Sequence, residues 1–308
     1  MTIYMTEQFH PDAMKRLSEL ATVVNTLDHP EEIDGIMIRA GGVSRELMEK
    51  CPNLKVIGRH GAGYDTVDLK AAKEKKITVV NVPSGNSDSV AELIVGLALN
   101  LERRISEANA ICRAEGYPTI APANCQGTEL KGKTFGSIGM GNIASRAAKI
   151  MANGFGMKVL GYDRQSTPEQ AREKVFEKVE TVEELLRRSD VVNISVPLNA
   201  GTKDMISGAM FDCFKPGAIL INCARGGVVN EDDLYDALVT GKLKAAACDA
   251  FVQEPVMKEN KLLSLPNFSA TPHIGGNTVD AIRRTGLELV ENVIHVIKGE
   301  PASGIVKL

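Results

Sequence analysis

Short apolar runs alternate with amphipathic stretches along the whole chain, and this alternation predicts parallel strands connected by helices. The first hundred residues contain five candidate strands, at 3–4, 22–24, 35–38, 55–58 and 78–80. Candidate helices lie between them at 11–20, 44–49 and 68–75, and Pro11 and Ser44 are typical residues for a helix start. The pattern over 89–114 predicts one long helix that leads into a second domain.

A second series of strands follows a segment at 116–127 that is rich in proline, alanine and glycine and is expected to be a surface connection. Six strands are predicted, at 134–138, 158–162, 191–196, 218–222, 245–248 and 268–270. Six is the number in a complete doubly wound dinucleotide-binding fold. A last helix is predicted at 278–298, ended by Gly299 and Pro301, which leaves the final residues free to return to the first domain.

The composition narrows the functional classes. The chain has 308 residues, enough for two domains, and it is 44% apolar with no tryptophan, which predicts an aliphatic core. A net charge of −3 gives no electrostatic reason to expect a nucleic-acid or membrane partner. The six cysteines form no CxxC pair, so we expect free thiols in a reducing cytoplasm and no metal site. We also expect no secretory signal and no membrane span.

A dinucleotide-binding fingerprint lies at residues 139–144, which read GMGNIA, directly after a predicted strand. Gly139 allows a tight turn, and Gly141 lets the backbone approach a pyrophosphate. The third position is Ala144, which tolerates a methyl group. The turn opens a helix whose amino-terminal amides can bind phosphate, and whose inward face is predicted to contain Ile143, Ala147, Ile150 and Met151.

The end of the next strand predicts the cofactor. Asp163 lies 22 residues after Gly141, where a carboxylate accepts hydrogen bonds from the adenosine ribose and repels a 2′-phosphate. This favours NAD over NADP, although Arg164 alongside weakens the argument.

Charged residues also follow three later strands, and ligands of open α/β sheets bind at the carboxyl ends of strands. Arg225 follows 219–224, Asp249 follows 245–248 with Glu254 beyond it, and His273 follows 269–272. Reduction of a 2-oxo acid needs a bidentate cation for the carboxylate and ketone, a role that Arg225 suits. It also needs a proton donor near neutral pH, which His273 can be, and a carboxylate to orient the ring.

With these motifs the chain resembles the D-isomer-specific 2-hydroxyacid dehydrogenase family over nearly its whole length. The segments that carry the resemblance are 127–130 with 132–134, 139–144, 222–227, 254–255 and 271–276. The resemblance implies two doubly wound α/β domains, a flavodoxin-like substrate domain at 1–100 plus 286–308 and an inserted Rossmann NAD-binding domain at 101–285. It also implies a homodimer formed largely through the NAD-binding domains.

The resemblance implies a catalytic trio of Arg225, Glu254 and His273. We assign cofactor binding to Gly139, Gly141, Asn142, Ile143, Asp163, Pro197, Ala224 and Asp249, with Asp249 near the nicotinamide. The expected activity is interconversion of a small D-2-hydroxy acid and its 2-oxo acid by hydride transfer with NAD.

Within the family, residues 58–65 and 82–86 are most similar to the phosphoglycerate dehydrogenase branch, which makes 3-phosphoglycerate a candidate substrate. The amides of Gly61, Ala62 and Gly63 would bind the substrate carboxylate. Arg59 and Arg39 would meet a second negative charge, unless both make interdomain ion pairs. His60 and Tyr64 stand where smaller residues are frequent. Because the sequence ends at Leu308, we expect no regulatory domain and no feedback through one.

Several other activities remain open. Hydroxypyruvate or glyoxylate reductase, a lactate-type enzyme and sulfolactate dehydrogenase differ from this prediction only around Arg39, Arg59, His60 and the loop at 84–87. Formate dehydrogenase is disfavoured because Glu254 is present. An NAD-binding corepressor-like scaffold is a remote alternative from another functional class.

Overall fold

The computed structural model describes residues 1–114, 116–117, 119–173 and 175–308, and these form two compact units. Unit 1 comprises 1–89 and 276–308, and unit 2 comprises 90–275. The chain therefore passes between the units at other positions than the boundaries expected at 100–101 and 285–286. Pro118, part of the expected surface connection, lies outside the described residues.

Unit 1 is built on a five-stranded parallel sheet in the order β2-β1-β3-β4-β5. Its strands are β1 (Thr2–Met5), β2 (Thr22–Val24), β3 (Ile33–Ile38), β4 (Val56–Arg59) and β5 (Thr78–Asn81). The order 2-1-3-4-5 is the flavodoxin-like one, as predicted.

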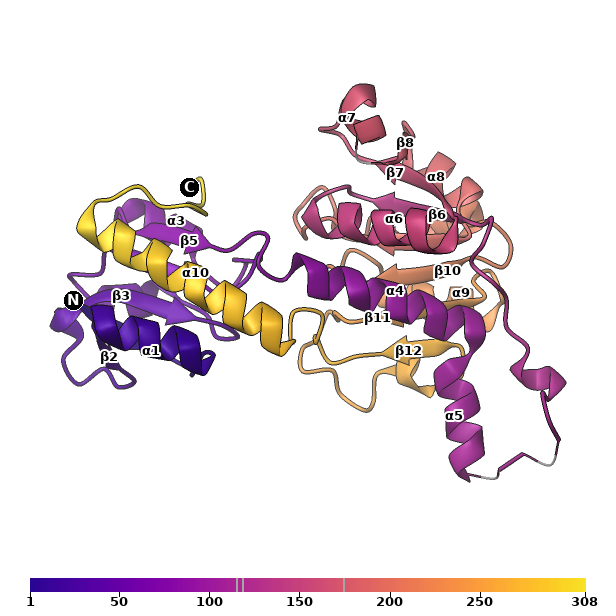
Figure 1. Ribbon diagram of the computed structural model, residues 1–308, viewed down its shortest axis with the longest axis horizontal. Coiled ribbons are helices and arrows are strands. Elements are labelled where there is room, and N and C mark those ends of the chain that lie inside the picture. The colour runs from indigo at the N-terminus through magenta and orange to yellow at the C-terminus, as the bar shows by residue number, and fades with distance from the viewer. Residues whose placement is uncertain (115, 118, 174) are drawn as a thin grey trace. The chain divides into compact units, whose positions relative to one another are not determined.

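Helices cover both faces of this sheet. They are α1 (Pro11–Leu20), α2 (Arg45–Lys50), α3 (Leu69–Glu74) and α10 (Val279–Lys298), with the 3₁₀ turn η1 (Pro30–Glu32). One face packs against α1 and α10, which Figure 1 shows side by side, and the other packs against α2 and α3. The return of α10 to this sheet explains why the end of the chain belongs to unit 1.

Unit 2 contains a seven-stranded parallel sheet in the order β12-β11-β10-β9-β6-β7-β8. The strands are β6 (Thr134–Ile138), β7 (Lys158–Tyr162), β8 (Glu177–Lys178), β9 (Val191–Ile194), β10 (Ile219–Asn222), β11 (Ala245–Cys248) and β12 (Phe268–Ala270). Counted from β6, the order is 3-2-1-4-5-6 with a seventh strand added, which confirms the doubly wound prediction. The prediction missed β8, because its two residues, Glu177 and Lys178, carry no apolar pattern.

The helices of unit 2 form two layers. They are α4 (Ser87–Arg103, whose first turn belongs to unit 1), α5 (Ile105–Ala114), α6 (Asn142–Phe155), α7 (Pro168–Glu173), α8 (Val182–Arg188) and α9 (Glu231–Val239). Shorter 3₁₀ turns are η2 (Ala123–Cys125), η3 (Gly208–Cys213) and η4 (Lys261–Ser264). α4 and α6 pack on one face of the sheet, and α8 and α9 pack on the other (Figure 1). Both layers bury mainly aliphatic side chains, as the composition predicts.

The prediction of one helix over 89–114 is wrong, because the helix breaks at Arg104, which has a left-handed φ of 54°. In an unbroken helix the Ser106 amide would donate to the Glu102 carbonyl. Instead, that carbonyl accepts from the Thr128 amide at 2.8 Å, and the Ser106 amide donates to the Asn100 side chain at 2.8 Å. The Thr128 amide thus takes the place that the Ser106 amide would have at the Glu102 carbonyl in a continuous helix.

The predicted inward face of α6 is partly wrong. Ala147 and Met151 are fully buried, but Ile150 is 36% exposed. Ala144 and Ala148 are buried in its place, since the helix packs closely on the sheet through small side chains. Across the described part of the chain, no helix is both long and apolar enough to span a bilayer.

Candidate functional site

The glycine turn after β6 is built around Gly139. Its φ is +88°, and a Cβ atom there would lie 2.4 Å from the Ser195 carbonyl oxygen. Its amide donates to the Tyr162 carbonyl at 2.8 Å. Only glycine can combine this positive φ with so close an approach to the Ser195 carbonyl. Gly139 therefore allows the sharp turn between β6 and α6.

Gly141 is the N-cap of α6 and offers no side chain to the first helical turn. A Cβ atom at Gly141 would meet no atom within 4 Å, so the space beside the helix start is open. The amides of this turn are therefore accessible to an anion, as a pyrophosphate requires. Asn142 is exposed, whereas Ile143 is partly buried against the core.

A cavity of about 550 Å³ adjoins this turn. Its lining comes from the ends of three neighbouring strands. These residues are Gly139, Met140 and Gly141 after β6, 162–166 with Gln170 at the end of β7, and Ser195, Val196, Pro197, Asn199, Thr202 and Met205 after β9. Asp163 lies in this lining, and its carboxylate accepts from the Gln165 amide at 3.0 Å and the Ser166 hydroxyl at 2.5 Å. The predicted phosphate-binding and ribose-binding groups thus face one cavity whose chemistry fits a dinucleotide.

His273 and Glu254 are brought together by two loops of unit 2. Nδ1 of His273 lies 2.8 Å from Oε2 of Glu254, and the side chains are 48% and 39% exposed. The second carboxylate oxygen accepts from the Phe251 amide at 3.0 Å, which holds Glu254 in place. Since a carboxylate accepts, Nδ1 carries the hydrogen of this pair, and Nε2 is left for another partner.

Asp249 is bonded to the loop that carries His273. It is 2% exposed, and its Oδ1 accepts from the Thr271 hydroxyl at 2.6 Å and the Ile274 amide at 2.8 Å, while Oδ2 accepts from the Gly275 amide at 2.8 Å. These bonds enclose His273, whose φ of 54° is unusual for a residue with a side chain. The sequence predicted a cofactor contact for Asp249, but it did not predict these hydrogen bonds to residues on both sides of His273.

Arg225 lies in the loop after β10, and its guanidinium donates to the Ala224 carbonyl at 2.8 Å. Asn222 shapes the loop, because its side chain accepts from the Ala224 amide and donates to the Arg225 carbonyl. Burial raises the pKa of the neighbouring Cys223 thiol well above its usual value, so that thiol stays protonated. All six cysteines are free.

Sequence reasoning missed two residues that join the loops of Arg225 and Glu254. A Cβ atom on Gly226 would lie 1.9 Å from the Phe251 carbonyl carbon, so the two loops touch through backbone alone. Glu231 accepts from the Val252 amide at 2.7 Å and from the Asn260 side chain at 3.0 Å. The pair of glycines at 226–227 was a visible signal for the close approach, but nothing in the sequence marked Glu231.

In unit 1, the predicted substrate residues lie around the ends of β3 and β4. Arg39 donates to the Asn277 side-chain oxygen at 2.5 Å, and the Arg59 guanidinium donates to the His60 carbonyl. Ala62 accepts from the Asn81 side chain at 2.7 Å, which holds the 61–63 backbone against β5.

His60 is buried in unit 1, at 7% exposure. Its Nε2 lies 3.1 Å from the Ile282 carbonyl oxygen, and its ring meets the edge of Phe9 at 4.9 Å between centroids. Burial, with a smaller effect from nearby Arg39 and Arg59, lowers its pKa from 6.5 to about 4. His60 is therefore neutral at pH 7.

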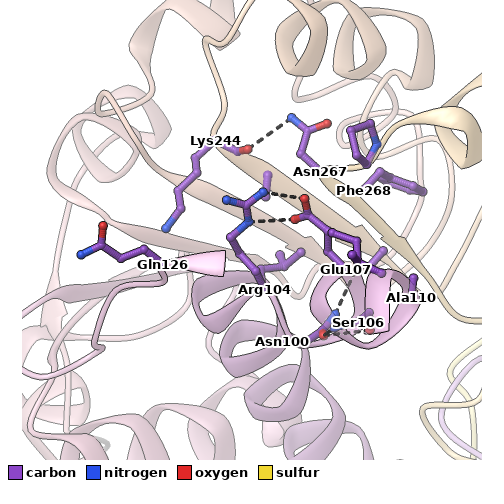
Figure 2. A pocket seen from close by; sticks show the side chains of 14 residues that line it. Asn100, Arg104, Ser106, Glu107, Ala110, Gln126, Lys244, Asn267 and Phe268 are labelled. Carbon is purple, nitrogen blue, oxygen red and sulfur yellow. Dashed lines mark hydrogen bonds and ion pairs between the residues drawn. The ribbon is translucent and has the colours of Figure 1, made fainter. Parts of the chain in front are cut away.

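A second cavity of unit 2, about 570 Å³, lies beside the first residues of β11 and β12, at the opposite sheet edge from the glycine turn. Figure 2 shows that several of its polar groups bond to one another. Arg104 pairs with Glu107, Asn100 with Ser106 and Ser269, and the Asn267 amide with the Lys244 carbonyl. None of the residues predicted for catalysis or cofactor binding lines it.

One group of potential metal ligands comes together in the described part of the chain: His29, Glu31 and Glu32 at η1, with ligand atoms within 4.8 Å of one another. All three residues are exposed, as solvated surface charges commonly are.

Comparison with known proteins agrees with this geometry. Residues 95–275 match the model of the D-isomer specific 2-hydroxyacid dehydrogenase, NAD binding domain. A D-3-phosphoglycerate dehydrogenase from Methanocaldococcus jannaschii is 39% identical over 99% of the chain, which spans only 59% of that relative's length. A hydroxypyruvate reductase from Thermotoga maritima is 41% identical over 85% of the chain and 84% of the relative.

A solved structure agrees over the full length. The TT0316 protein from Thermus thermophilus matches with a TM-score of 0.89 and 31% identity, covering 100% of both chains. The resemblance inferred from the sequence motifs is confirmed, as is the NAD-binding assignment at the level of the family model. The chain belongs to the D-isomer specific 2-hydroxyacid dehydrogenase family.

Proposed function

We propose that this protein is an NAD-dependent oxidoreductase that interconverts a small D-2-hydroxy acid and its 2-oxo acid. The observation that carries the proposal is the His273–Glu254 pair, with 2.8 Å between Nδ1 and Oε2, on the unit that matches the NAD-binding family model. When bound, the nicotinamide cofactor supplies or accepts the hydride. Unit 2 is proposed to bind NAD, and unit 1 to bind substrate.

The cofactor would be held by the cavity beside the glycine turn. The amides at Gly141, Asn142 and Ile143 suit the pyrophosphate, and Asp163 suits the ribose hydroxyls. We retain Gly139, Pro197, Ala224 and Asp249 as further proposed cofactor-binding positions. The Asp163 carboxylate disfavours a 2′-phosphate, so NAD is proposed over NADP.

His273 is proposed to transfer the proton. In the direction of reduction, its Nε2–H bond breaks and a new O–H bond forms at the alkoxide oxygen of the substrate, which leaves a neutral ring. Glu254 holds Nδ1 and stabilises the protonated ring by its charge, so it acts through His273. Asp249 fixes the loop that aims the ring.

Arg225 is proposed to bind the substrate carboxylate and to polarise the ketone oxygen. A guanidinium offers two parallel donors in a planar fork, which matches a carboxylate and fixes the orientation of the neighbouring carbonyl. The positive charge also stabilises negative charge that develops on the ketone oxygen.

For the substrate, we propose a 2-oxo acid with a second negative charge, such as 3-phosphohydroxypyruvate. Arg39 directly follows β3 and Arg59 ends the neighbouring strand β4, where it pairs with Ile38, and the 61–63 amides follow after His60. The name of the Methanocaldococcus jannaschii relative favours a phosphorylated acid. The name of the Thermotoga maritima relative favours hydroxypyruvate, which is the second candidate.

The test is NADH oxidation with purified protein and a panel of 2-oxo acids: phosphohydroxypyruvate, hydroxypyruvate, glyoxylate, pyruvate, phenylpyruvate and sulfopyruvate, with NADPH in parallel. Highest kcat/KM for a doubly charged acid supports the proposed substrate class. Preference for hydroxypyruvate supports the second candidate. NADH binding without turnover on any acid would contradict the enzyme proposal and favour a scaffold.

We also propose a cytoplasmic homodimer. The six free cysteines suit a reducing compartment. The helix α5 has no buried residue, and Ile105 on it is 54% exposed, so a second copy would give its apolar side a partner. Light scattering coupled to gel filtration tests this, since a mass near one chain would contradict it.

A further inference from the structure

Two polar side chains lie inside the aliphatic core beneath the glycine turn. Ser137 on β6 and Asn193 on β9 are neighbours across the ladder, and both are fully buried. They share a sheet face with Phe135, Val191 and Ile221, which pack against α4 and α6. Two aliphatic side chains would fill this place without the cost of burying polar groups.

The hydrogen bonds of this pair run in one direction, toward the turn. The Ser137 hydroxyl donates to the Gly139 carbonyl at 2.8 Å, and the Asn193 side-chain amide donates to the Ser137 oxygen at 2.9 Å. A serine hydroxyl has a single hydrogen, so Ser137 must accept from Asn193 while it donates to Gly139. Such chains of donors polarise one another.

Burying this pair has a further cost, because one of its hydrogen-bonding groups is unsatisfied among the described residues. Among the described residues, the side-chain oxygen of Asn193 is buried without a hydrogen-bond partner. Buried polar groups without partners are rare because they are costly to desolvate. A stability role alone does not account for this arrangement, which points to a role at the carbonyl that the pair reaches.

That carbonyl belongs to the turn proposed to bind the pyrophosphate. A trans peptide is planar, with its carbonyl and the next amide pointing in opposite directions. By holding the Gly139 carbonyl toward the Ser137 side chain, this bond points the Met140 amide hydrogen in the opposite direction within the same peptide plane. Gly139, Met140 and Gly141 all line the proposed dinucleotide cavity.

We propose that Asn193 and Ser137 are positioning residues that set the orientation of the Gly139–Met140 peptide for the cofactor pyrophosphate. This inference rests on the proposed NAD-binding function. It assigns a role in cofactor affinity to two fully buried residues that do not line the proposed cavity.

The test compares wild type with Ser137→Ala and with the double variant Ser137→Ala/Asn193→Leu, in which Leu matches Asn in branching and number of side-chain heavy atoms. Fluorescence titration gives the Kd for NADH, and calorimetry gives it for ADP-ribose and adenosine. Both variants are expected to bind NADH and ADP-ribose about fivefold more weakly, the scale of one lost hydrogen-bond contribution. Adenosine, which has no phosphate, is expected to bind as in wild type. The double variant should melt at a higher temperature than Ser137→Ala, since it also removes the Asn193 side chain, whose amide loses its acceptor in the single variant.

Ser189→Ala is the matched control. Ser189 is also fully buried and donates its hydroxyl to a carbonyl, that of Leu185 at 2.7 Å, but on α8 rather than at the turn. Its NADH affinity should equal that of wild type. The inference is wrong if the double variant binds NADH as tightly as wild type, or if adenosine loses as much affinity as ADP-ribose. A wild-type protein without NADH affinity would overturn the proposed function as well.

Discussion

Two histidines of this protein occupy similar places and have opposite properties. His60 directly follows β4, and His273 lies three residues after β12, so each lies beyond the carboxyl end of a parallel strand next to glycines. His273 is half-exposed and paired with Glu254, while His60 is buried, donates to a backbone carbonyl and has two arginines nearby.

The comparison shows that position in the fold does not by itself decide what a histidine can do. The Glu254 carboxylate holds Nδ1 of His273 and leaves Nε2 for another partner. Burial and neighbouring positive charge lower the pKa of His60 to about 4, so it cannot supply a proton near neutral pH. The residue type is shared, and the partner and the solvent exposure set the chemistry.

The largest effect is expected for His273→Ala. Loss of the proposed proton donor should lower kcat about 10³-fold, within the range of general acid–base catalysis. The Kd for NADH should stay near the wild-type value, because His273 is proposed to act on the substrate. Stopped-flow turnover and fluorescence titration measure the two quantities. His29→Ala, at an exposed histidine, is the control and should retain full turnover. Near wild-type turnover in His273→Ala would refute the assignment.

A smaller loss is expected for Arg225→Lys. An ammonium keeps the charge but cannot make two parallel hydrogen bonds, so kcat/KM for the 2-oxo acid should fall about 100-fold. The Kd for NADH should not change. Arg187→Lys, at an exposed arginine of the same unit, should behave as wild type. An Arg225→Lys variant with unchanged KM would exclude Arg225 from binding the substrate carboxylate.

Alternating apolar and polar stretches were sufficient to predict most of the fold. All strands of both sheets except β8, and the bounds of α1, agree with the prediction, because buried parallel strands and amphipathic helices leave strong local patterns. The break in the long predicted helix was missed because a distant segment decides it. The break at Arg104 depends on Thr128, which takes the Glu102 carbonyl, and no local pattern around 104 reports this.

The same limit applies to the site. The types and order of Arg225, Glu254 and His273 were visible in the sequence, and the structure adds the 2.8 Å contact between Glu254 and His273. The bonds from Asp249 to 271–275 and the role of Glu231 depend on loops that meet only after folding. The Ser137–Asn193 pair was missed for the same reason, since each residue alone looks like an ordinary strand position.

The environment of His60 leads to a prediction about substrate choice. If Arg59 meets the second charge of the substrate, Arg59→Ala should lower kcat/KM about tenfold for phosphohydroxypyruvate, the scale of one charge-assisted hydrogen bond. Pyruvate, which lacks that charge, should be used as by wild type. Steady-state kinetics on both acids measure the ratio, and Arg45→Ala, at a partly buried arginine of unit 1 that pairs with Glu74, is the control. Equal losses on the two acids would show that Arg59 only supports the fold.

The smallest effect concerns stability and tests the neutral state of His60. Its folded pKa is about 4 against 6.5 for an ordinary histidine, so the unfolded chain binds more protons between these values. The free energy of unfolding therefore carries no penalty from His60 well above pH 6.5. At pH 5, the free energy of unfolding of wild type should be lower by roughly 2 kcal/mol because of this one group. His60→Gln keeps a donor for the Ile282 carbonyl but does not titrate, so it should lose less stability between pH 7.5 and pH 5. Urea unfolding at both values measures the difference, and His29→Gln should follow wild type because His29 is exposed. If His60→Gln and wild type lost equal stability, His60 would not be held neutral, and the contrast with His273 would fail.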